Sequence, residues 1–292
     1  MNEQTISIDV FKKYPAIDEA KADALLKKEI EANETKIVVL DDDPTGVQTV
    51  HDVSVYTDWS RESIRKGFEE KNKLFYILTN SRGFTTEQTT AAHEEIASNI
   101  AAVAKDMGIR YIIMSRSDST LRGHYPLETE ILRKSYEKNT GKAIDGEILC
   151  PFFKEGGRFT IDDVHYVQYD DKLIPVNETE FARDRTFGYS ASTMPEYVEE
   201  KTGGVYKAGD VIGISLKDIH EMAIDKMEAQ LIEVKDFNKI VVNAIDYADI
   251  KVFCVALYRA MAKGKVFMFR TAAALVKVMG GVSDQPLLTR EQ

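Results

Sequence analysis

KIVVLDDDPTG, residues 36–46, joins a short apolar run to three consecutive aspartates. The run 37–40 is rich in β-branched residues and has the length of a buried strand. A turn follows directly, because Pro44 and Gly46 interrupt regular structure. Adjacent carboxylates make each other harder to ionise. The stretch therefore lies either in a solvated turn or in a site that holds a metal ion or a polyhydroxylated ligand.

The same kind of apolar run recurs along the chain. The further runs lie at residues 53–57, 74–79, 110–115, 146–151, 211–216, 239–244 and 265–270. Helical segments lie between most of them; in the longest, residues 85–107, Ile96, Ile100 and Val103 fall on one helix face. Strands that alternate with helices form right-handed βαβ crossovers. The sequence therefore predicts an α/β fold, an open, mostly parallel, twisted sheet flanked by helices.

Two parts of the chain depart from this alternation. Residues 1–35 carry Ala, Leu and Ile at helical spacing among many Lys and Glu, which predicts a helical lead-in of one helix or two. Residues 152–190 are rich in Gly, Asp and aromatics. They predict two short strands around a turn at Asp170 and Asp171, forming a β-rich cap or flap within the α/β domain of residues 36–281.

Composition excludes several classes of protein. A net charge of -10 disfavours non-specific nucleic-acid binding, which needs a basic face. No stretch approaches the roughly 20 apolar residues of a membrane span, and the N-terminus lacks the apolar region of an export signal. Cys150 and Cys254 lie inside apolar runs, where we expect buried thiols and no disulfide. A reduced, cytoplasmic protein is expected.

Polar side chains gather directly after the predicted strands. In a parallel sheet the carboxyl ends of all strands lie at one edge, and ligands bind there. Four segments bring carboxylates, hydroxyls and guanidiniums to this edge, namely residues 41–46, 79–83, 115–124 and 270–271. Asp and Ser after a strand also make good turns and helix caps. The density of charged groups nevertheless predicts one site for a small, anionic, hydroxylated ligand.

The residue types at this edge suit such a ligand. A guanidinium can bind a carboxylate or phosphate through two parallel hydrogen bonds. The guanidiniums here are those of Arg82, Arg116 and Arg122. A carboxylate can accept hydrogen bonds from hydroxyls, take a proton from one, or hold Mg²⁺. The carboxylates here are those of Asp42, Asp43 and Asp118. No spacing of Cys and His suggests a zinc site, and we assign no metal ligands. The sequence also contains no glycine-rich loop of the kind that binds nucleotides.

One partial match is to the haloacid-dehalogenase-like phosphatases. VVLDDDPT resembles the first motif of that family, and FYILTN resembles the second. The resemblance implies that Asp41 is a nucleophile and Asp43 the acid/base of a Mg²⁺-dependent phosphatase. NAIDYADI offers Asp246 and Asp249 for the paired acidic motif, but no lysine-bearing strand precedes it.

A larger set of motifs resembles another family. In chain order these are LDDDPTGVQTVHD, TNSRGFT, RSDSTLRGHYPLETE, PFFKEGGRFTIDDVHYV, ETEFARD and FRTAAALVKVMGG. Over roughly residues 36–281 the chain resembles the N-terminal, substrate-binding half of the four-carbon acid sugar kinases, and DSTLRG is the specific signature. Those kinases transfer the γ-phosphoryl group of ATP to a hydroxyl of threonate, erythronate or a related oxo-tetronate.

The resemblance implies a set of site residues. The substrate loops are matched by Asp42, Asp43, Thr45 and Gly46, by Asn80, Ser81 and Arg82, and by Ser117, Asp118, Ser119, Arg122 and Gly123, with Arg116 and His124 beside them. Further motif positions, without an assigned role, are Arg158, Glu178, Asp184 and Arg270. We expect Asp43 or Asp118 to be the base that orients the accepting hydroxyl, with Mg²⁺ and a phosphate-binding loop stabilising the transferred group.

Members of that family continue into a second lobe that binds ATP through glycine-rich segments. This sequence shows no such segment, and residues 282–292 are expected to be a shortened linker toward a missing or separate ATP-binding lobe. We expect ATP and Mg²⁺ to serve the complete kinase, with neither site evident in this chain. Because phosphate positioning is most of kinase catalysis, binding without turnover is expected. A non-catalytic sugar-acid-binding protein is the remaining alternative.

Overall fold

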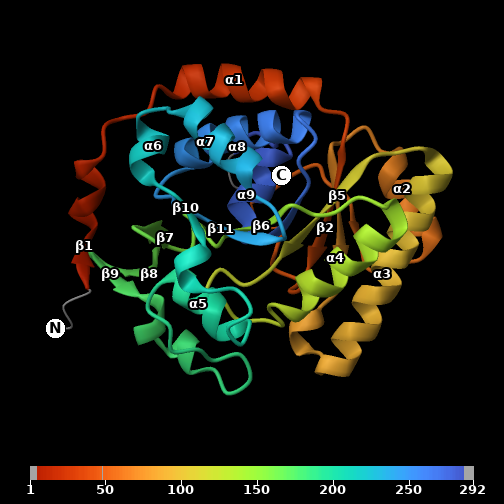
Figure 1. The fold of residues 1–292 in the computed structure, drawn as a ribbon, viewed down its shortest axis with the longest axis horizontal. Coiled ribbons are helices and arrows are strands. Elements are labelled where there is room, and N and C mark those ends of the chain that lie inside the picture. The colour runs from red at the N-terminus through yellow and green to blue at the C-terminus, as the bar shows by residue number, and fades with distance from the viewer. Residues whose placement is uncertain (1–4, 48, 286–292) are drawn as a thin grey trace, which may run out of the picture.

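The computed structural model describes residues 5–47 and 49–285. Its centre is a sheet of eight strands in which every neighbouring pair is parallel (Figure 1). In spatial order the strands are β10 (Ile212–Ile214), β11 (Asn238–Val242), β6 (Gly146–Cys150), β12 (Phe267–Thr271), β5 (Tyr111–Arg116), β2 (Lys36–Asp41), β4 (Leu74–Leu78) and β3 (Val55–Tyr56). Each apolar run predicted as a strand overlaps one of these, and the predicted α/β fold is confirmed.

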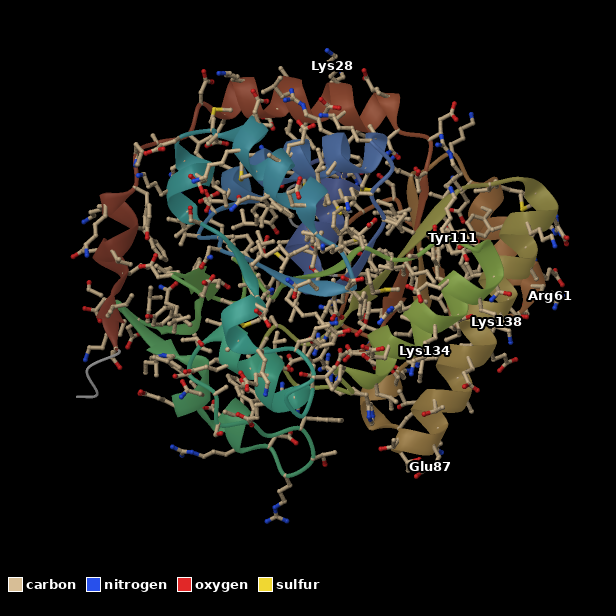
Figure 2. The ribbon with its side chains drawn as sticks, in the orientation of Figure 1. Lys28, Arg61, Glu87, Tyr111, Lys134 and Lys138 are labelled. Atoms are coloured by element: carbon tan, nitrogen blue, oxygen red, sulfur yellow. The ribbon has the colours of Figure 1, made fainter. Side chains whose placement is uncertain are left out.

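Helices cover both faces of this sheet. One face carries α1 (Glu19–Ala32), α6 (Leu216–His220), α7 (Ile224–Glu233), α8 (Tyr247–Ala262) and α9 (Ala273–Met279). The other carries α2 (Arg61–Glu69), α3 (Thr86–Met107), α4 (Leu127–Thr140) and α5 (Met194–Lys201). Their polar sides face solvent, as Lys28 and Arg61 do in Figure 2. Because both faces of the sheet are covered, β2 needs apolar residues at every central position, which explains its unbroken run.

A small antiparallel sheet, here called the cap sheet, lies beside the carboxyl ends of the main strands. Its order is β1 (Ile6–Ser7), β9 (Lys172–Pro175), β8 (Val164–Tyr169) and β7 (Arg158–Ile161). Bridges between Phe153 and Arg158 and between Thr160 and Ala244 join it to the segments that follow β6 and β11. The cap sheet is therefore held close to the edge where the candidate site residues emerge.

The predicted pair of strands around Asp170 and Asp171 is confirmed by β8 and β9, but the strand β7 was not predicted, and the three strands form two successive hairpins. The first turn is at Asp162 and Asp163, whose φ angles of 48° and 62° are left-handed. Aspartate tolerates that conformation better than most residues, so the pair was a usable signal for the extra turn. The pairing of β1 with β9 was also unexpected. It depends on contacts between residues more than 160 positions apart, for which no local pattern exists.

Short 3-10 helices complete the described chain. They are η1 (Ile8–Lys13), η2 (Ser81–Gly83), η3 (Val176–Glu178), η4 (Glu180–Arg183) and η5 (Ala208–Asp210). Cys150 and Cys254 are buried and free, as predicted. Within the described residues, no helix has the length and apolar character needed to cross a membrane. Of the expected linker 282–292, residues 286–292 lie outside the described part.

A buried ion pair links two central strands. Lys239 of β11 and Glu147 of β6 lie in register, both 0% exposed, with their charged atoms 2.6 Å apart. The Lys239 ammonium also lies 3.6 Å from the centre of the Phe237 ring. We expect Lys239→Met to lower the free energy of unfolding by about 3–5 kcal/mol, because it leaves the Glu147 charge buried and unpaired.

Urea unfolding followed by circular dichroism would measure this loss. Lys66→Met, which breaks the exposed pair with Glu62, is the matched control and should have far less effect. The double variant Lys239→Met with Glu147→Leu should recover much of the stability. Equal losses in the single and double variants would contradict the buried-charge explanation.

Candidate functional site

Four neighbouring strands end at the same level. The register pairs Asp41 of β2 with Leu78 of β4 and with Arg116 of β5, and Arg116 in turn with Thr271 of β12. The loops that follow β2, β4 and β5 therefore leave the sheet side by side, next to Arg270 in β12. The sequence motifs placed most of their charged residues in these loops, and the structure brings them to one edge.

Two arginines pair with the three adjacent aspartates. Asp41 accepts a hydrogen bond from Nη1 of Arg116 at 3.0 Å. Asp42 is held by Arg82 through two nitrogens, with Nη2 at 2.6 Å from Oδ1 and Nε at 3.2 Å from Oδ2. The third nitrogen of Arg82, Nη1, donates to Asp43 at 2.9 Å. One guanidinium thus binds two carboxylates, which offsets the repulsion between them.

The three carboxyl groups differ in acidity because their surroundings differ. Burial raises the pKa of Asp41 to about 6, although Arg116 opposes the shift. Burial also raises the pKa of Asp42, against the opposing effect of Arg82. Burial would likewise raise the pKa of Asp43, but hydrogen bonds from Thr45 and the charge of Arg82 outweigh it, so that pKa lies below its usual value. Asp43 is therefore ionised at neutral pH.

Gly46 closes the first loop over Asp41. A Cβ at this position would lie 1.7 Å from Oδ2 of Asp41, so only glycine fits. Asp41 is 1% exposed beneath the loop and is paired with Arg116. A phosphatase nucleophile must reach its substrate, and in this arrangement the Asp41 carboxylate does not. The geometry gives the phosphatase interpretation no support.

The second loop contains Asn80, Ser81 and Arg82. Asn80 is exposed at the rim, with a left-handed φ of 53°. Ser81 is fully buried and donates from its hydroxyl to Oε1 of Glu128 at 3.1 Å. Glu128, on α4, also lies 3.9 Å from Nε2 of the buried His93. Ser81 therefore supports the loop from inside, while Asn80 and Arg82 face the edge.

In the third loop an ion pair holds Asp118. Nε of Arg122 donates to its Oδ2 at 2.7 Å, and the hydroxyl of Thr120 donates to the same oxygen. Burial would raise the pKa of Asp118, but these hydrogen bonds and the charges of Arg122 and Arg82 lower it to about 2. Asp118 is therefore an ionised hydrogen-bond acceptor throughout the physiological pH range.

Other predicted residues of this loop hold its backbone in place. The amide of Ser117 donates to the carbonyl of Thr271 at 2.8 Å. The carbonyl of Ser119 lies 2.7 Å from Nε2 of His165, and Nε2 of His124 lies 3.0 Å from the carbonyl of Phe84. Burial lowers the pKa of His165 to about 4, so the ring is neutral at pH 7 and donates from Nε2.

The cap sheet and β12 bring two further predicted arginines to the edge. Arg270 is 5% exposed and donates from Nη2 to the carbonyl of Arg122 at 2.8 Å. Arg158 begins β7, and its guanidinium carbon lies 5.5 Å from the centre of the Phe181 ring. The guanidinium of Arg122 lies 5.0 Å from the same ring. Phe181, in η4, therefore belongs to the site through its contacts with both arginines.

Glu178 and Asp184 matched motif positions, but their hydrogen bonds stabilise the backbone around η3 and η4. The carboxylate of Asp184 accepts backbone N–H bonds from Thr186 and Phe187 at 2.8 and 2.9 Å, which closes the loop after η4. Glu178 lies in η3, where its carbonyl accepts a bond from Arg183 at 3.4 Å. Neither side chain has a direct contact with Asp42, Asp118 or Arg270 in the described part of the chain.

Two residues of the site were missed from sequence. Glu128 lies on a helix, where a glutamate is usually exposed, and only the tertiary structure reveals that it is buried behind Ser81. Phe181 lies inside the motif ETEFARD, which pointed to the right segment but not to the ring. An aromatic residue in an irregular, polar segment was the available signal for it.

The carboxylates do not form a metal site. Within residues 5–47 and 49–285, no three His, Cys, Asp or Glu side chains gather as metal ligands. Asp42 and Asp43 both face the guanidinium of Arg82. A positive charge between the two donors disfavours Mg²⁺ there. The described residues therefore do not fit a bound Mg²⁺ at the triple aspartate.

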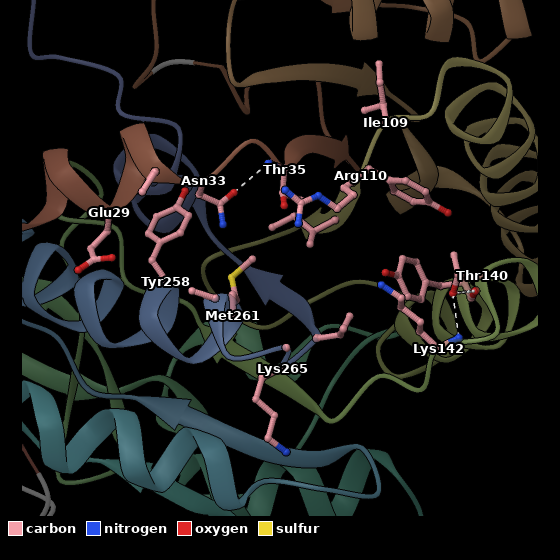
Figure 3. A pocket seen from close by; sticks show the side chains of 17 residues that line it. Glu29, Asn33, Thr35, Ile109, Arg110, Thr140, Lys142, Tyr258, Met261 and Lys265 are labelled. Atoms are coloured by element: carbon pink, nitrogen blue, oxygen red, sulfur yellow. Dashed lines mark hydrogen bonds between the residues drawn. The ribbon is translucent and has the colours of Figure 1, made fainter.

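A cavity of about 470 Å³ lies at the other edge of the sheet (Figure 3). It is lined by residues that precede strands, among them Thr35 before β2, Arg110 before β5 and Lys265 before β12. The predicted site residues do not line it. Because ligands of parallel sheets bind beyond the carboxyl ends of the strands, the charged edge remains the candidate site.

Comparison with known proteins identifies the family. A family model described as a sugar-binding N-terminal domain matches residues 37–279. The chain belongs to this family. The match covers all four segments of the charged edge, so the loops described above are part of a sugar-binding domain. No protein with a curated description matches the chain significantly.

Solved structures share the fold of this sugar-binding domain. A domain-of-unknown-function protein (DUF1537) from Bordetella bronchiseptica, with bound citrate as a domain-swapped dimer, has a TM-score of 0.60 at 18% identity, over 84% of this chain and 55% of that one. A DUF1537 protein from Haemophilus influenzae has a TM-score of 0.55 at 14% identity, over 83% of this chain and 55% of that one. The chain thus spans little more than half the length of these neighbours. The predicted match to a sugar-binding N-terminal domain is confirmed by the family model, and these DUF1537 structures share its fold.

The low pKa of Asp118 predicts how stability depends on pH. The group binds a proton less readily when folded than when unfolded, so its stabilisation is present above about pH 4 and disappears as the pH falls toward 2. We expect Asp118→Asn to lose about 2 kcal/mol of unfolding free energy at pH 7. The difference from the unaltered protein should shrink as the pH falls below 4.

Denaturant unfolding at pH 7 and at pH 2.5 would test this. Asp106→Asn, at an exposed position on α3, is the control and should follow the unaltered protein at both values. If Asp118→Asn is equally destabilised at both values, the Asp118–Arg122 pair is not the source of the effect.

Proposed function

We propose that this domain binds a four-carbon sugar acid and acts as the substrate lobe of an ATP-dependent kinase. The observation that carries the proposal is the convergence of ionised carboxylates and guanidiniums at one strand edge. Asp43 and Asp118 can accept hydrogen bonds from hydroxyls, and arginines can bind the acid group. The citrate in the Bordetella neighbour supports the same ligand class, because citrate is a small hydroxylated acid.

Either Asp43 or Asp118 is proposed to orient the hydroxyl that accepts the phosphoryl group. The pKa of each lies below its usual value, so both are weak bases that remain ionised. A weak base suffices in this reaction, because most of the catalysis is positioning and electrostatic stabilisation of the phosphoryl group. A fixed, ionised acceptor supplies the positioning.

We place ATP and Mg²⁺ on a separate lobe of the complete kinase. The proposal is supported by the length of the solved neighbours, of which this chain spans 55% in the Bordetella and Haemophilus structures. It also agrees with the triple aspartate being occupied by arginines, which leaves no carboxylate cluster for Mg²⁺ among the described residues. A cytoplasmic location, where ATP is abundant, is part of the same proposal.

Thermal unfolding with and without ligand tests the binding. We expect threonate or erythronate to raise the melting temperature, since a ligand at 100 times its Kd stabilises by about 2.7 kcal/mol. For a chain of this size that corresponds to roughly 4–5 °C. Butyrate, which has the acid group without hydroxyls, is the control and should shift it little. No shift with any four-carbon sugar acid at millimolar concentration would refute the proposal.

Asn80→Gly separates binding from stability. Glycine keeps the left-handed backbone at this position and removes only the exposed amide. We expect the Kd for the bound sugar acid to rise about 3- to 10-fold through loss of one hydrogen bond, with the melting temperature of the ligand-free protein unchanged. Isothermal titration calorimetry would measure the Kd, and an unaltered value would remove Asn80 from the site.

A further inference from the structure

The arginines of the charged edge fall into two groups. Arg82, Arg116 and Arg122 each form an ion pair with an aspartate, at 2.6–3.0 Å. Arg158 and Arg270 form none with any described carboxylate within the 4.0 Å limit for such a pair. Two of the five guanidiniums therefore bring a positive charge to the site without a direct carboxylate partner among the described residues.

Both unpaired guanidiniums have lost part of their contact with water. Arg270 is 5% exposed, and Nε of Arg158 and Nε of Arg270 are buried atoms for which the described residues supply no acceptor. Burial lowers the pKa of Arg158, against the opposing charge of Asp118. A buried donor without a partner costs about 1–3 kcal/mol, so such donors normally meet an acceptor. An anionic ligand would supply the counter-charge that both guanidiniums lack.

The two arginines come from different parts of the fold, and both lie near Arg122. Arg158 forms a β-bridge with Phe153, which lies in the segment directly after β6. Strand β6 is the neighbour of β12, which carries Arg270. The carbonyl of Arg122 accepts from Arg270 at 2.8 Å, while its guanidinium shares the Phe181 ring with Arg158. Two guanidiniums thus lie within 5.5 Å of the centre of one aromatic ring, and a ring face attracts cations.

Asp42 and Arg270 lie close together at Gly123. A Cβ built on this glycine would lie 3.3 Å from Oδ2 of Asp42 and 3.5 Å from Nη2 of Arg270. Because glycine has no side chain, nothing at this position separates the carboxylate from the guanidinium. Gly123 has a φ of 119°, which side chains rarely adopt, so the backbone conformation also favours glycine here. Oδ2 of Asp42 can still accept a hydrogen bond, because Arg82 occupies one of its two lone pairs.

We propose that Arg158 and Arg270 bind the carboxylate of the ligand and that Asp42 binds the hydroxyl on the adjacent carbon. The recognised unit is then a 2-hydroxy acid, with its acid group between the cap sheet and the main sheet. The remaining hydroxyls point toward Asp43 and Asp118. This inference rests on the proposed function, in which the ligand is a hydroxylated acid. It assigns particular residues to the acid end and to the hydroxyl end of that ligand. Phe181 is a positioning residue for the acid end.

Calorimetric titration of single-residue variants with threonate tests the assignment. Arg158→Met and Arg270→Met should each raise the Kd about 10- to 100-fold, the loss expected for a charged hydrogen bond. Arg185→Met removes an exposed charge from the loop after η4 and should leave the Kd within twofold. Because Arg270 is buried, its replacement by Met can also reduce stability, so Arg270→Lys serves as a second variant. Lysine keeps the positive charge but cannot donate two parallel hydrogen bonds, and it should also weaken binding.

Deoxy analogues of threonate test the hydroxyl assignment in the unaltered protein. 2,4-Dihydroxybutyrate keeps the 2-hydroxyl and should bind within a few-fold of threonate. 3,4-Dihydroxybutyrate lacks it and should bind about tenfold more weakly. Erythritol, which lacks the acid group, should show no heat of binding at the same concentration. Phe181→Leu should weaken threonate binding several-fold with the melting temperature of the free protein unchanged.

The outcomes separate this inference from the proposed function. If the unaltered protein binds threonate and Arg158→Met binds it equally well, the assignment of the acid end is wrong and the proposed function stands. If 3,4-dihydroxybutyrate binds as tightly as threonate, the assignment of the 2-hydroxyl is wrong. If the unaltered protein binds no sugar acid, the proposed function fails and the inference fails with it.

Discussion

The contact of Arg82 with Asp42 and Asp43 is the interaction on which the site depends. Three adjacent carboxylates at the end of a buried strand repel one another and lose hydration, and both effects disfavour the charged form. Arg82 binds two of them with three nitrogens, and it comes from the loop of the neighbouring strand. The same contact neutralises the charges and joins the loops after β2 and β4. The site is thereby formed before any ligand arrives, which lowers the entropic cost of binding.

Arg116 and Arg122 extend the same arrangement. Each neutralises one aspartate at the carboxyl edge, so the floor of the site is a set of paired charges in place of a strongly negative surface. What remains unpaired is positive and lies toward the cap sheet, at Arg158 and Arg270. The paired charges suit the hydroxyls along a ligand, and the unpaired arginines suit an acid group at one end of it.

Much of this could be read from the sequence because it depends on local pattern. Apolar runs of strand length between helical segments predicted the parallel sheet, and residues that follow a strand necessarily come to its carboxyl edge. The first hairpin turn of the cap sheet was missed, although the aspartate pair at 162 and 163 was a signal for it. The strand β1 left no signal, since it consists of two residues whose partner, β9, lies far along the chain.

The sequence by itself determined the fold class, the family and the loops that meet at the edge, because strand and helix periods and turn residues act over a few positions. The tertiary structure decided which charges cancel. Arg82 and Asp42 are 40 residues apart, and Arg116 and Asp41 are 75 apart. No local rule pairs them, since an ion pair depends on distance in space and on burial. For the same reason, only the folded chain distinguishes Arg158 and Arg270 from the arginines that are already paired.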